Sequence, residues 1–292
     1  MEFRGAITAL VTPFRNGEVD EEAFRSLIEW QIEQGIHGLV PCGTTGESAT
    51  LSHAEHKRVI RICVDQVKGR VPVLAGAGSN NTKEAIELTR EAKNAKADGA
   101  LLITPYYNKP TQSGLIAHFK AIGAAVDIPI IVYNVPGRTA LNLLPETLAT
   151  IRKEVPQVVG VKEATGNLKQ VSDVIEYCGP DFQVLSGDDF TALATMGIGG
   201  RGVISVVSNF APRTVSDMCE AFFAGDLKKA QQIHYALCPL FRGAFLETNP
   251  VPAKMALSWM GRIPFEARLP LVPMSPSNQA KFKEILTAAG LL

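Results

Sequence analysis

Lys162 ends a short apolar run, the sequence Val-Val-Gly-Val-Lys-Glu at residues 158–163. A run of this length is typical of a buried strand, which has no solvent-facing side to receive a charge. Desolvation favours the neutral amine of lysine, which is a nucleophile toward carbonyl carbons. The position therefore indicates Schiff-base formation. A surface lysine paired with Glu163 is the alternative, although adjacent residues on a strand face opposite ways.

Tyr133 ends another short apolar run, residues 130–133. Side chains alternate along a strand, so in a barrel where Lys162 points inward, Gly160 and Tyr133 point inward too. A glycine below Lys162 would leave room for the lysine stem, and the phenol could shuttle protons to an intermediate held on the amine. Core filling by Tyr133 is the alternative.

Two further segments could bind anions. Residues 43–48, Gly-Thr-Thr-Gly-Glu-Ser, can present backbone N–H groups and two hydroxyls to a small carboxylate, or form an ordinary turn. They lack the Gly-Lys-Ser/Thr ending of a nucleotide-binding loop. Arg138, in Pro-Gly-Arg-Thr at residues 136–139, is suited to bidentate capture of a second carboxylate, or is a solvated arginine.

Of the adjacent Tyr106 and Tyr107, one could serve packing and the other a site.

His53 and His56 stand three residues apart on a predicted helix and could suggest metal ligands. No third ligand has a recognisable spacing, so we predict no metal and favour two solvated histidines.

The five cysteines are scattered and odd in number, with no Cys-x-x-Cys pair, which indicates reduced thiols.

Short β-rich apolar segments alternate with helical patterns, which is the rhythm of a parallel sheet with helical crossovers. Asp20 and Ser52 each precede a helical pattern, and Ser52 and Glu55 have the spacing of a capping box. The predicted strands are residues 6–10, 38–40, 71–74, 100–103, 130–133, 158–162, 183–185 and 202–206. The predicted helices are residues 21–34, 53–67, 82–96, 114–125, 145–153, 168–177, 189–196 and 214–224.

Eight repeats of strand then helix predict an α/β fold, a (β/α)8 TIM barrel over residues 1–225, with a C-terminal helical region over residues 226–292. Barrel active sites lie at the carboxyl ends of the strands, which is where the candidates above fall. A doubly wound open sheet is the alternative. It usually carries a Gly-x-Gly-x-x-Gly turn after its first strand, and residues 8–16 contain none.

Composition narrows the classes of function. The 292 residues, 46% of them apolar, suffice for a sizeable core. Lys and Arg number 29, as do Asp and Glu, and no basic block is interleaved with aromatics, so nucleic acid is not an expected partner. No apolar run approaches the roughly 20 residues that span a bilayer, and the start lacks a leader pattern. We expect no membrane association and a cytoplasmic location.

Taken together, five motifs resemble the dihydrodipicolinate synthase family of pyruvate-dependent Schiff-base enzymes, over essentially the whole chain. They are the turn at residues 43–48, Thr-Pro-Tyr-Tyr-Asn at 104–108, Tyr-Asn-Val-Pro-Gly-Arg-Thr at 133–139, Gly-Val-Lys-Glu-Ala at 160–164 and Leu-Ser-Gly-Asp-Asp at 185–189. The resemblance implies a 4-hydroxy-tetrahydrodipicolinate synthase reaction. Lys162 would condense with pyruvate, and the enamine would attack aspartate 4-semialdehyde on the diaminopimelate route to lysine. It implies neither a metal nor an organic cofactor.

The resemblance also implies roles for the other residues. Thr45 would hold the pyruvate carboxylate, Arg138 the carboxylate of the semialdehyde, and Gly187 and Ile204 would line the pyruvate pocket through backbone groups. Tyr133 would be the acid/base, linked through Thr44 to Tyr107 in a proton relay. The family donates the residue matching Tyr107 across a dimer interface, so a homo-oligomer is expected, typically a tetramer of two tight dimers.

An allosteric lysine site is implied as well, and it explains the two histidines better than metal does. Glu84 would pair with the ammonium of the ligand, and inhibition by lysine is expected. The matching residues are Ser48, Ala49, His53, His56, Asn80, Glu84 and Tyr106.

Two alternatives stay open on the sequence. Another pyruvate-dependent class I aldolase, such as N-acetylneuraminate lyase or a keto-sugar-acid aldolase, would keep Lys162 and Tyr133 but bind a different aldehyde. Arg138 favours a short acceptor with a carboxylate. A non-catalytic amino-acid sensor would use the pocket around His53, His56 and Glu84 without turnover.

Overall fold

The structure is a computed structural model that describes residues 2–292. The chain divides into two compact units. The first comprises Pro72–Ile204 with the N-terminal residues as far as Arg4, and the second comprises Gly5–Val71 with Ser205–Leu292. The second unit is therefore built from both ends of the sequence.

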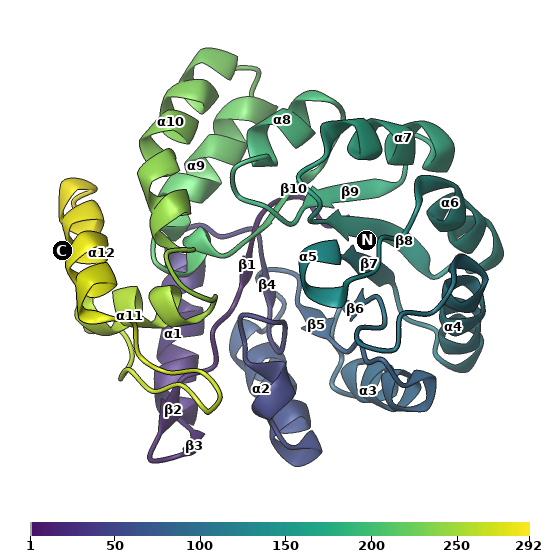
Figure 1. The fold of residues 1–292 in the computed structure, drawn as a ribbon, viewed down its shortest axis with the longest axis horizontal. Helices are drawn as coiled ribbons and strands as arrows, with labels where there is room; N and C mark the ends of the chain where they lie inside the picture. Colours follow the sequence, from purple (N-terminus) through teal and green to yellow (C-terminus); the bar gives the residue numbers. More distant parts are fainter. Residues whose placement is uncertain (1) are drawn as a thin grey trace. The chain divides into compact units, whose positions relative to one another are not determined.

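The first unit is a parallel sheet covered by helices. Its strands are hydrogen-bonded in sequence order: β5 (Leu74–Gly76), β6 (Gly99–Ile103), β7 (Ile130–Asn134), β8 (Val158–Glu163), β9 (Gln183–Ser186) and β10 (Gly202–Ser205), which runs into the second unit. Figure 1 shows helices flanking these strands on their outer side. They are α3 (Thr82–Asn94), α4 (Gln112–Ala125), α6 (Pro145–Glu154), α7 (Leu168–Cys178) and α8 (Ala192–Gly197). The short helix α5 (Pro136–Thr139) directly follows β7 and is not one of these outer helices.

Apolar side chains on both faces explain why these strands form a parallel sheet. All five residues of β7 are buried, as are five of the six in β8. Strands buried on both faces are characteristic of parallel sheets covered by helices. The register places Tyr133 of β7 beside Lys162 of β8, and Lys162 beside Leu185 of β9.

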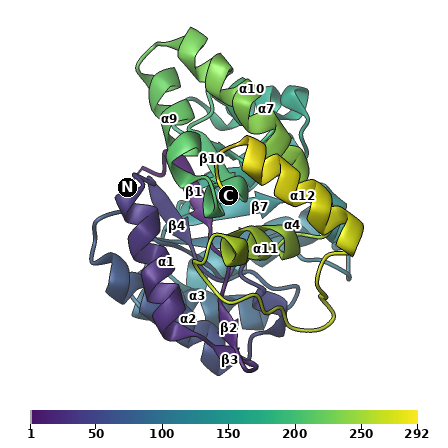
Figure 2. The same ribbon diagram turned by 90° about the vertical axis from the view of Figure 1, so that its left-hand side faces the viewer.

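The second unit contains the parallel pair β1 (Gly5–Ala9) and β4 (Gly38–Val40), and the antiparallel hairpin β2 (Phe14–Arg15) and β3 (Glu18–Val19). Figure 2 shows its C-terminal helices α10, α11 and α12 next to one another. The buried amide of Gln31 donates to the carbonyl oxygens of Ser208 and Asn209, which joins the two chain segments. The helices are α1 (Glu21–Glu33), η1 (Ser48–Thr50), α2 (His53–Val67), η2 (Val207–Asn209), α9 (Pro212–Phe223), α10 (Leu227–Gly243), α11 (Val251–Trp259) and α12 (Pro276–Ala288).

Local signals in the sequence define several helix ends. Asp20 caps α1 by accepting a hydrogen bond from the Ala23 N–H at 3.0 Å. The predicted capping box is confirmed, because Ser52 accepts from the Glu55 N–H while Glu55 accepts from the Ser52 N–H. These contacts satisfy N–H groups that have no partner inside a helix.

Most predicted elements lie within two residues of the observed ones, and the C-terminal region is helical as predicted. Two predicted elements are wrong by three residues at their start. The strand predicted at 71–74 is β5, because the Val73 N–H binds the Asp98 carboxylate and the ladder begins at Leu74. The helix predicted at 189–196 is α8, because Asp188 forms a turn with Ser186 and Phe190.

The β2–β3 hairpin and the short helix α5 were not predicted from the sequence. Among residues 2–292, no helix has the length and apolar character that crossing a bilayer requires.

Candidate active site

Lys162 is buried at the carboxyl end of β8, with 6% of its surface exposed. Its Nζ lies 4.2 Å from the centroid of the Tyr133 ring. Because the two residues are also register partners on neighbouring strands, the prediction that the amine and the phenol share one rim is confirmed. An amine at this distance from an aromatic face is attracted when it is charged, and it has a proton-transfer group beside it.

Burial lowers the pKa of Lys162 to about 8, and the positive charge of Arg138 acts in the same direction. The Asp189 carboxylate opposes the shift. At pH 7 about one such lysine in ten is uncharged, against about one in three thousand for a lysine with an ordinary pKa. The site therefore makes a nucleophilic amine available at neutral pH, as the sequence indicated.

Gly187, which follows β9, makes room for the stem of Lys162. A Cβ at Gly187 would lie 3.0 Å from Lys162 Cε and 2.6 Å from the Cβ of Ala164. We predicted that Gly160 gives this clearance, and that stays a prediction. The three atoms nearest a Cβ at Gly160 belong to its register partner Gln183 and to Ile131, so this glycine permits close strand packing.

Arg138 lies on α5, the short helix that directly follows β7. Its side chain is exposed, and its charge acts on the pKa of Lys162. Pro136 begins this helix, where its missing N–H costs no hydrogen bond. The chain thus turns sharply after Tyr133 and carries a guanidinium on the same side as the amine.

A buried amide network, which the sequence reading missed, holds the chain after β7. Glu163 is 3% exposed, and its carboxylate accepts from Asn134 Nδ2 at 3.0 Å and from Gln170 Nε2 at 3.1 Å. Asn134 also donates to Asn142 at 2.8 Å and accepts from the Leu143 N–H. We call Asn134, Asn142, Glu163 and Gln170 the amide network. It joins the strand of Tyr133 to the strand of Lys162.

Tyr107 has an exposed surface of 91% and a left-handed backbone with φ of 70°. The Tyr106 carbonyl accepts from the Asn80 side chain at 3.2 Å, and Glu84 binds the Ser79 hydroxyl. The structure therefore brings Asn80, Glu84 and Tyr106 into one region of the first unit. Ile204 is fully buried on β10 of the same unit.

The turn at residues 43–48, which contains Thr44 and Thr45, belongs to the second unit. The turn is closed by bonds from the Gly46 N–H to the Gly43 carbonyl and from the Glu47 N–H to the Thr44 carbonyl. Thr45 is 3% exposed, and its Oγ1 accepts from Asn249 Nδ2 at 2.9 Å. Ser48 and Ala49 follow in η1, with His53 and the buried His56 on α2.

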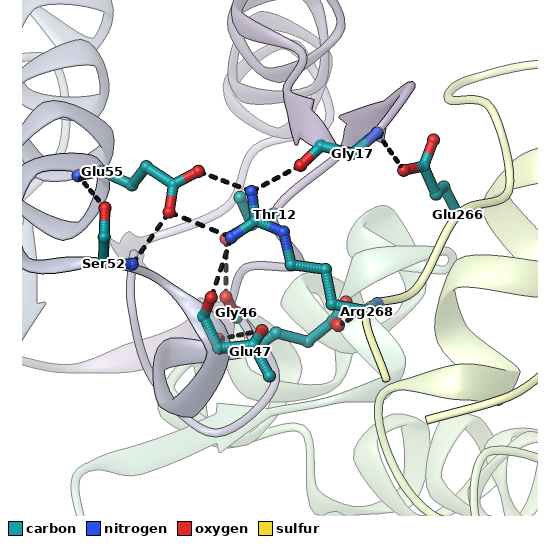
Figure 3. A network of polar contacts seen from close by, with 9 residues as sticks. Thr12, Gly17, Gly46, Glu47, Ser52, Glu55, Glu266 and Arg268 are labelled. Atoms are coloured by element: carbon teal, nitrogen blue, oxygen red, sulfur yellow. Dashed lines mark hydrogen bonds and ion pairs between the residues drawn. The ribbon is translucent and has the colours of Figure 1, made fainter. Parts of the chain in front are cut away.

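Glu47 of this turn forms a buried ion pair with Lys254 of α11, a second feature that the sequence reading missed. Burial lowers the pKa of Lys254, and the Glu47 carboxylate opposes the shift. Figure 3 shows the surroundings of Glu47, with the Thr12 hydroxyl donating to the Gly46 carbonyl and Arg268 beside Glu47.

Residues 2–292 contain no group of three or more His, Cys, Asp or Glu side chains that could hold a metal ion. The five cysteines are free thiols. Burial raises the pKa of the Cys42 thiol well above its ordinary value.

The chain is similar to known proteins over essentially its whole length. The Dihydrodipicolinate synthetase family model matches residues 2–289. The 4-hydroxy-tetrahydrodipicolinate synthase of Nitratidesulfovibrio vulgaris strain Miyazaki F is 69% identical over 292 residues, which is 100% of both chains.

Among solved structures, dihydrodipicolinate synthase from Aquifex aeolicus matches with a TM-score of 0.98 at 47% identity. The Acinetobacter baumannii enzyme complexed with pyruvate matches with a TM-score of 0.96 at 44% identity. The Cyanidioschyzon merolae enzyme with lysine bound matches with a TM-score of 0.96 at 42% identity. Each match covers 99% of both chains.

These structures confirm the predicted TIM-barrel fold with its C-terminal helices. The chain belongs to the dihydrodipicolinate synthetase family, and it is a lyase with 4-hydroxy-tetrahydrodipicolinate synthase activity in the diaminopimelate route to lysine.

Proposed function

We propose that this enzyme condenses pyruvate with aspartate 4-semialdehyde through a Schiff base on Lys162. The observation that carries the proposal is the buried amine, whose pKa is lowered to about 8, beside the Tyr133 ring. The pyruvate complex of the Acinetobacter baumannii relative supports the choice of the first substrate.

The chemistry follows from a neutral amine with a proton donor beside it. Lys162 adds to the keto carbon of pyruvate, and loss of water gives an imine. Removal of a methyl proton gives an enamine, whose carbon attacks the aldehyde of the semialdehyde and leaves an alkoxide that takes up a proton. The amino group of the semialdehyde then displaces Lys162 from the imine carbon, which closes the ring and regenerates the amine.

The remaining site residues take the roles that the family resemblance implies. Tyr133 transfers protons, and we propose that Thr44 and Tyr107 complete a relay with it. Arg138 binds the carboxylate of the semialdehyde; its charge and its exposed place after β7 support this role. Thr45 binds the pyruvate carboxylate, and Gly187 and Ile204 line the pyruvate pocket.

We further propose that lysine inhibits the enzyme by binding at the residues named in the sequence analysis. The lysine-bound structure of the Cyanidioschyzon merolae relative supports the proposal. So does the grouping of Asn80, Glu84 and Tyr106, since Glu84 is an acidic group suited to a ligand ammonium. Binding is coupled to catalysis only if lysine favours one state of the enzyme over another.

The working form that we propose is a tetramer made of two dimers, with Tyr107 donated to the site of a neighbouring copy. An aromatic side chain that is 91% exposed supports this role. Residues 1–225 as the catalytic barrel, residues 226–292 as a helical region, and the cytoplasmic location stay predictions.

Reductive trapping tests the proposed function. Borohydride reduction with pyruvate should add one pyruvyl group per chain, located at Lys162 by peptide mass spectrometry, and Lys162→Arg should abolish it. The trapping rate should rise with pH up to about 8 and then level off, because only the neutral amine reacts.

A coupled assay with aspartate 4-semialdehyde should show turnover, and added lysine should reduce it. An adduct on Lys162 without turnover would instead indicate another aldolase of the same family. Absence of any adduct would refute the Schiff-base mechanism.

A further inference from the structure

The second unit contains a lysine and a glutamate that are paired without access to water. The side chains of Lys254 and Glu47 have exposed surfaces of 0% and 1%. Taking both charges out of water costs several kcal/mol per ion, and apolar residues of similar size are often at least as stabilising. Stabilisation of the fold is therefore a weak explanation for burying this ion pair. The contacts around the pair suggest another role for it.

Both carboxylate oxygens of Glu47 are held. Oε1 accepts from Lys254 Nζ, and Oε2 accepts from the Arg268 backbone N–H at 3.0 Å. Lys254 Nζ also donates to the Glu266 carbonyl at 2.7 Å. The guanidinium of Arg268 donates to the Thr50 carbonyl at 2.8 Å and to Glu55 at 3.0 Å, as Figure 3 shows for the Glu55 contact. The position of the Glu47 side chain is thus fixed from several directions.

The backbone of Glu47 is in an unfavourable conformation. Its φ is 53°, in the left-handed region that residues with a Cβ rarely adopt, and Cys42 just before the turn has a φ of 57°. Such conformations persist only where the surroundings hold them. The Glu47 N–H donates to the Thr44 carbonyl, and this hydrogen bond links the position of Glu47 to that of the turn residues Thr44 and Thr45.

The segment that supplies Lys254 also contacts Thr45 directly. Asn249, just before α11, donates from Nδ2 to Thr45 Oγ1 at 2.9 Å, and both side chains are buried. A hydroxyl whose oxygen already accepts a bond keeps its own hydrogen free to donate. Thr45 is thereby set to donate to an anion, and the same chain segment fixes the turn through Lys254.

We propose that Lys254, acting through Glu47, is a positioning residue that orients Thr45 in the turn at residues 43–48 and so sets the affinity for the carboxylate of the keto-acid substrate. The proposal rests on the proposed function, in which that substrate is pyruvate. Lys254 acts through the turn and needs no contact with the substrate. Its loss should weaken pyruvate binding and leave the chemistry at Lys162 intact.

The test uses full-length chains carrying Lys254→Met, Glu47→Gln, or both substitutions. The main readout is the pyruvate concentration that gives half-maximal borohydride trapping, and the second is the steady-state KM for pyruvate alongside kcat. Each variant should raise both concentrations about tenfold or more, the effect of losing one oriented bond to a charged group. We expect kcat and the KM for the semialdehyde to stay within about twofold of wild type.

The double variant separates positioning from stability. Lys254→Met alone leaves Glu47 buried without its cation and should lower the melting temperature. Adding Glu47→Gln removes that unpaired charge. The double variant should regain thermal stability yet keep its weak pyruvate binding. If its half-saturating pyruvate concentration returned to the wild-type value, the pair would be structural only and the proposal would be overturned.

Leu286→Ala is the matched control, since Leu286 is fully buried in α12 of the same unit. It should lower the melting temperature without changing the pyruvate concentration for half-maximal trapping. If it raised that concentration as much as Lys254→Met does, the effect would be a general loss of stability. If wild type formed no adduct, the proposed function would fail, and with it this inference. Unchanged pyruvate affinity in all three variants would overturn this inference alone.

Discussion

The amine of Lys162 lies in surroundings that favour its neutral form, so its burial destabilises the folded protein at neutral pH. The folded pKa of about 8 lies below the ordinary value of 10.5. Below pH 8 the lysine is charged in both the folded and unfolded states, and the full cost applies. Between pH 8 and 10.5 the unfolded state binds more protons, so the cost disappears as pH rises.

Lys162→Met should therefore stabilise the protein at pH 7, by about 3 kcal/mol from the size of the pKa shift. The gain should shrink as the pH rises from 8 to 10.5. Urea unfolding of both proteins across this pH range measures it. Lys169→Met, at an exposed lysine on α7, should change the stability little at any pH. A gain that did not depend on pH would contradict burial of the charge as its cause.

The proximity of Lys162 and Tyr133 could be predicted from the sequence because the alternation of side chains along a strand is a local rule. The observed register, in which the two residues are partners on neighbouring strands, confirms the prediction. Gly187 and Asp189 act on Lys162 from the end of another strand, which no local pattern indicates. The partners Glu47 and Lys254 lie 207 residues apart, a pairing that only the tertiary fold creates.

The amide network ties β7 to β8 and to the start of α7. Glu163→Leu should destabilise the protein by about 2–4 kcal/mol, because the buried amides of Asn134 and Gln170 each lose one acceptor. Glu163→Gln, which keeps one acceptor oxygen, should cost less. Chemical denaturation measures both variants.

Glu176→Leu serves as the matched control, because Glu176 is an exposed glutamate on α7 and should change stability by less than about 0.5 kcal/mol. An equal effect at Glu163 and Glu176 would show that the amide network does not stabilise the fold. The network holds the chain on both sides of α5, at Asn134 and at Leu143, so Glu163→Leu should raise the KM for the semialdehyde more than that for pyruvate.

Element boundaries were predictable where a local contact defines them. The Ser52 capping box fixes the start of α2, whose bounds coincide with the predicted helix. The β2–β3 hairpin was missed although Asn16 and Gly17, both with positive φ, form a two-residue turn of a well-known type. The start of β5 depends on Asp98, which is distant in sequence. The apolar residues at 71–74 alone therefore predicted a strand that begins three residues before the observed one.

At the scale of the whole molecule, the two compact units differ in how the chain builds them. The first is almost one continuous segment, Pro72–Ile204, and its paired strands β5 to β10 are neighbours in sequence. The second requires residues from both ends of the chain, as the bonds from Gln31 to Ser208 and from Asn249 to Thr45 show. Contacts between distant residues slow folding, because the entropy of closing long loops opposes them.

This arrangement has a consequence for synthesis on the ribosome. Thr45 and Glu47 of the turn emerge early, yet their partners Asn249 and Lys254 lie more than 200 residues later in the chain. A nascent chain stalled after residue 246 should protect residues 72–204 from protease while residues 5–71 are cleaved, and release of the complete chain should protect both. Mass spectrometry of the digested chains tests this order, and early protection of residues 5–71 would refute it. The turn at residues 43–48 would thus reach its native contacts only after Asn249 and Lys254 have been synthesised.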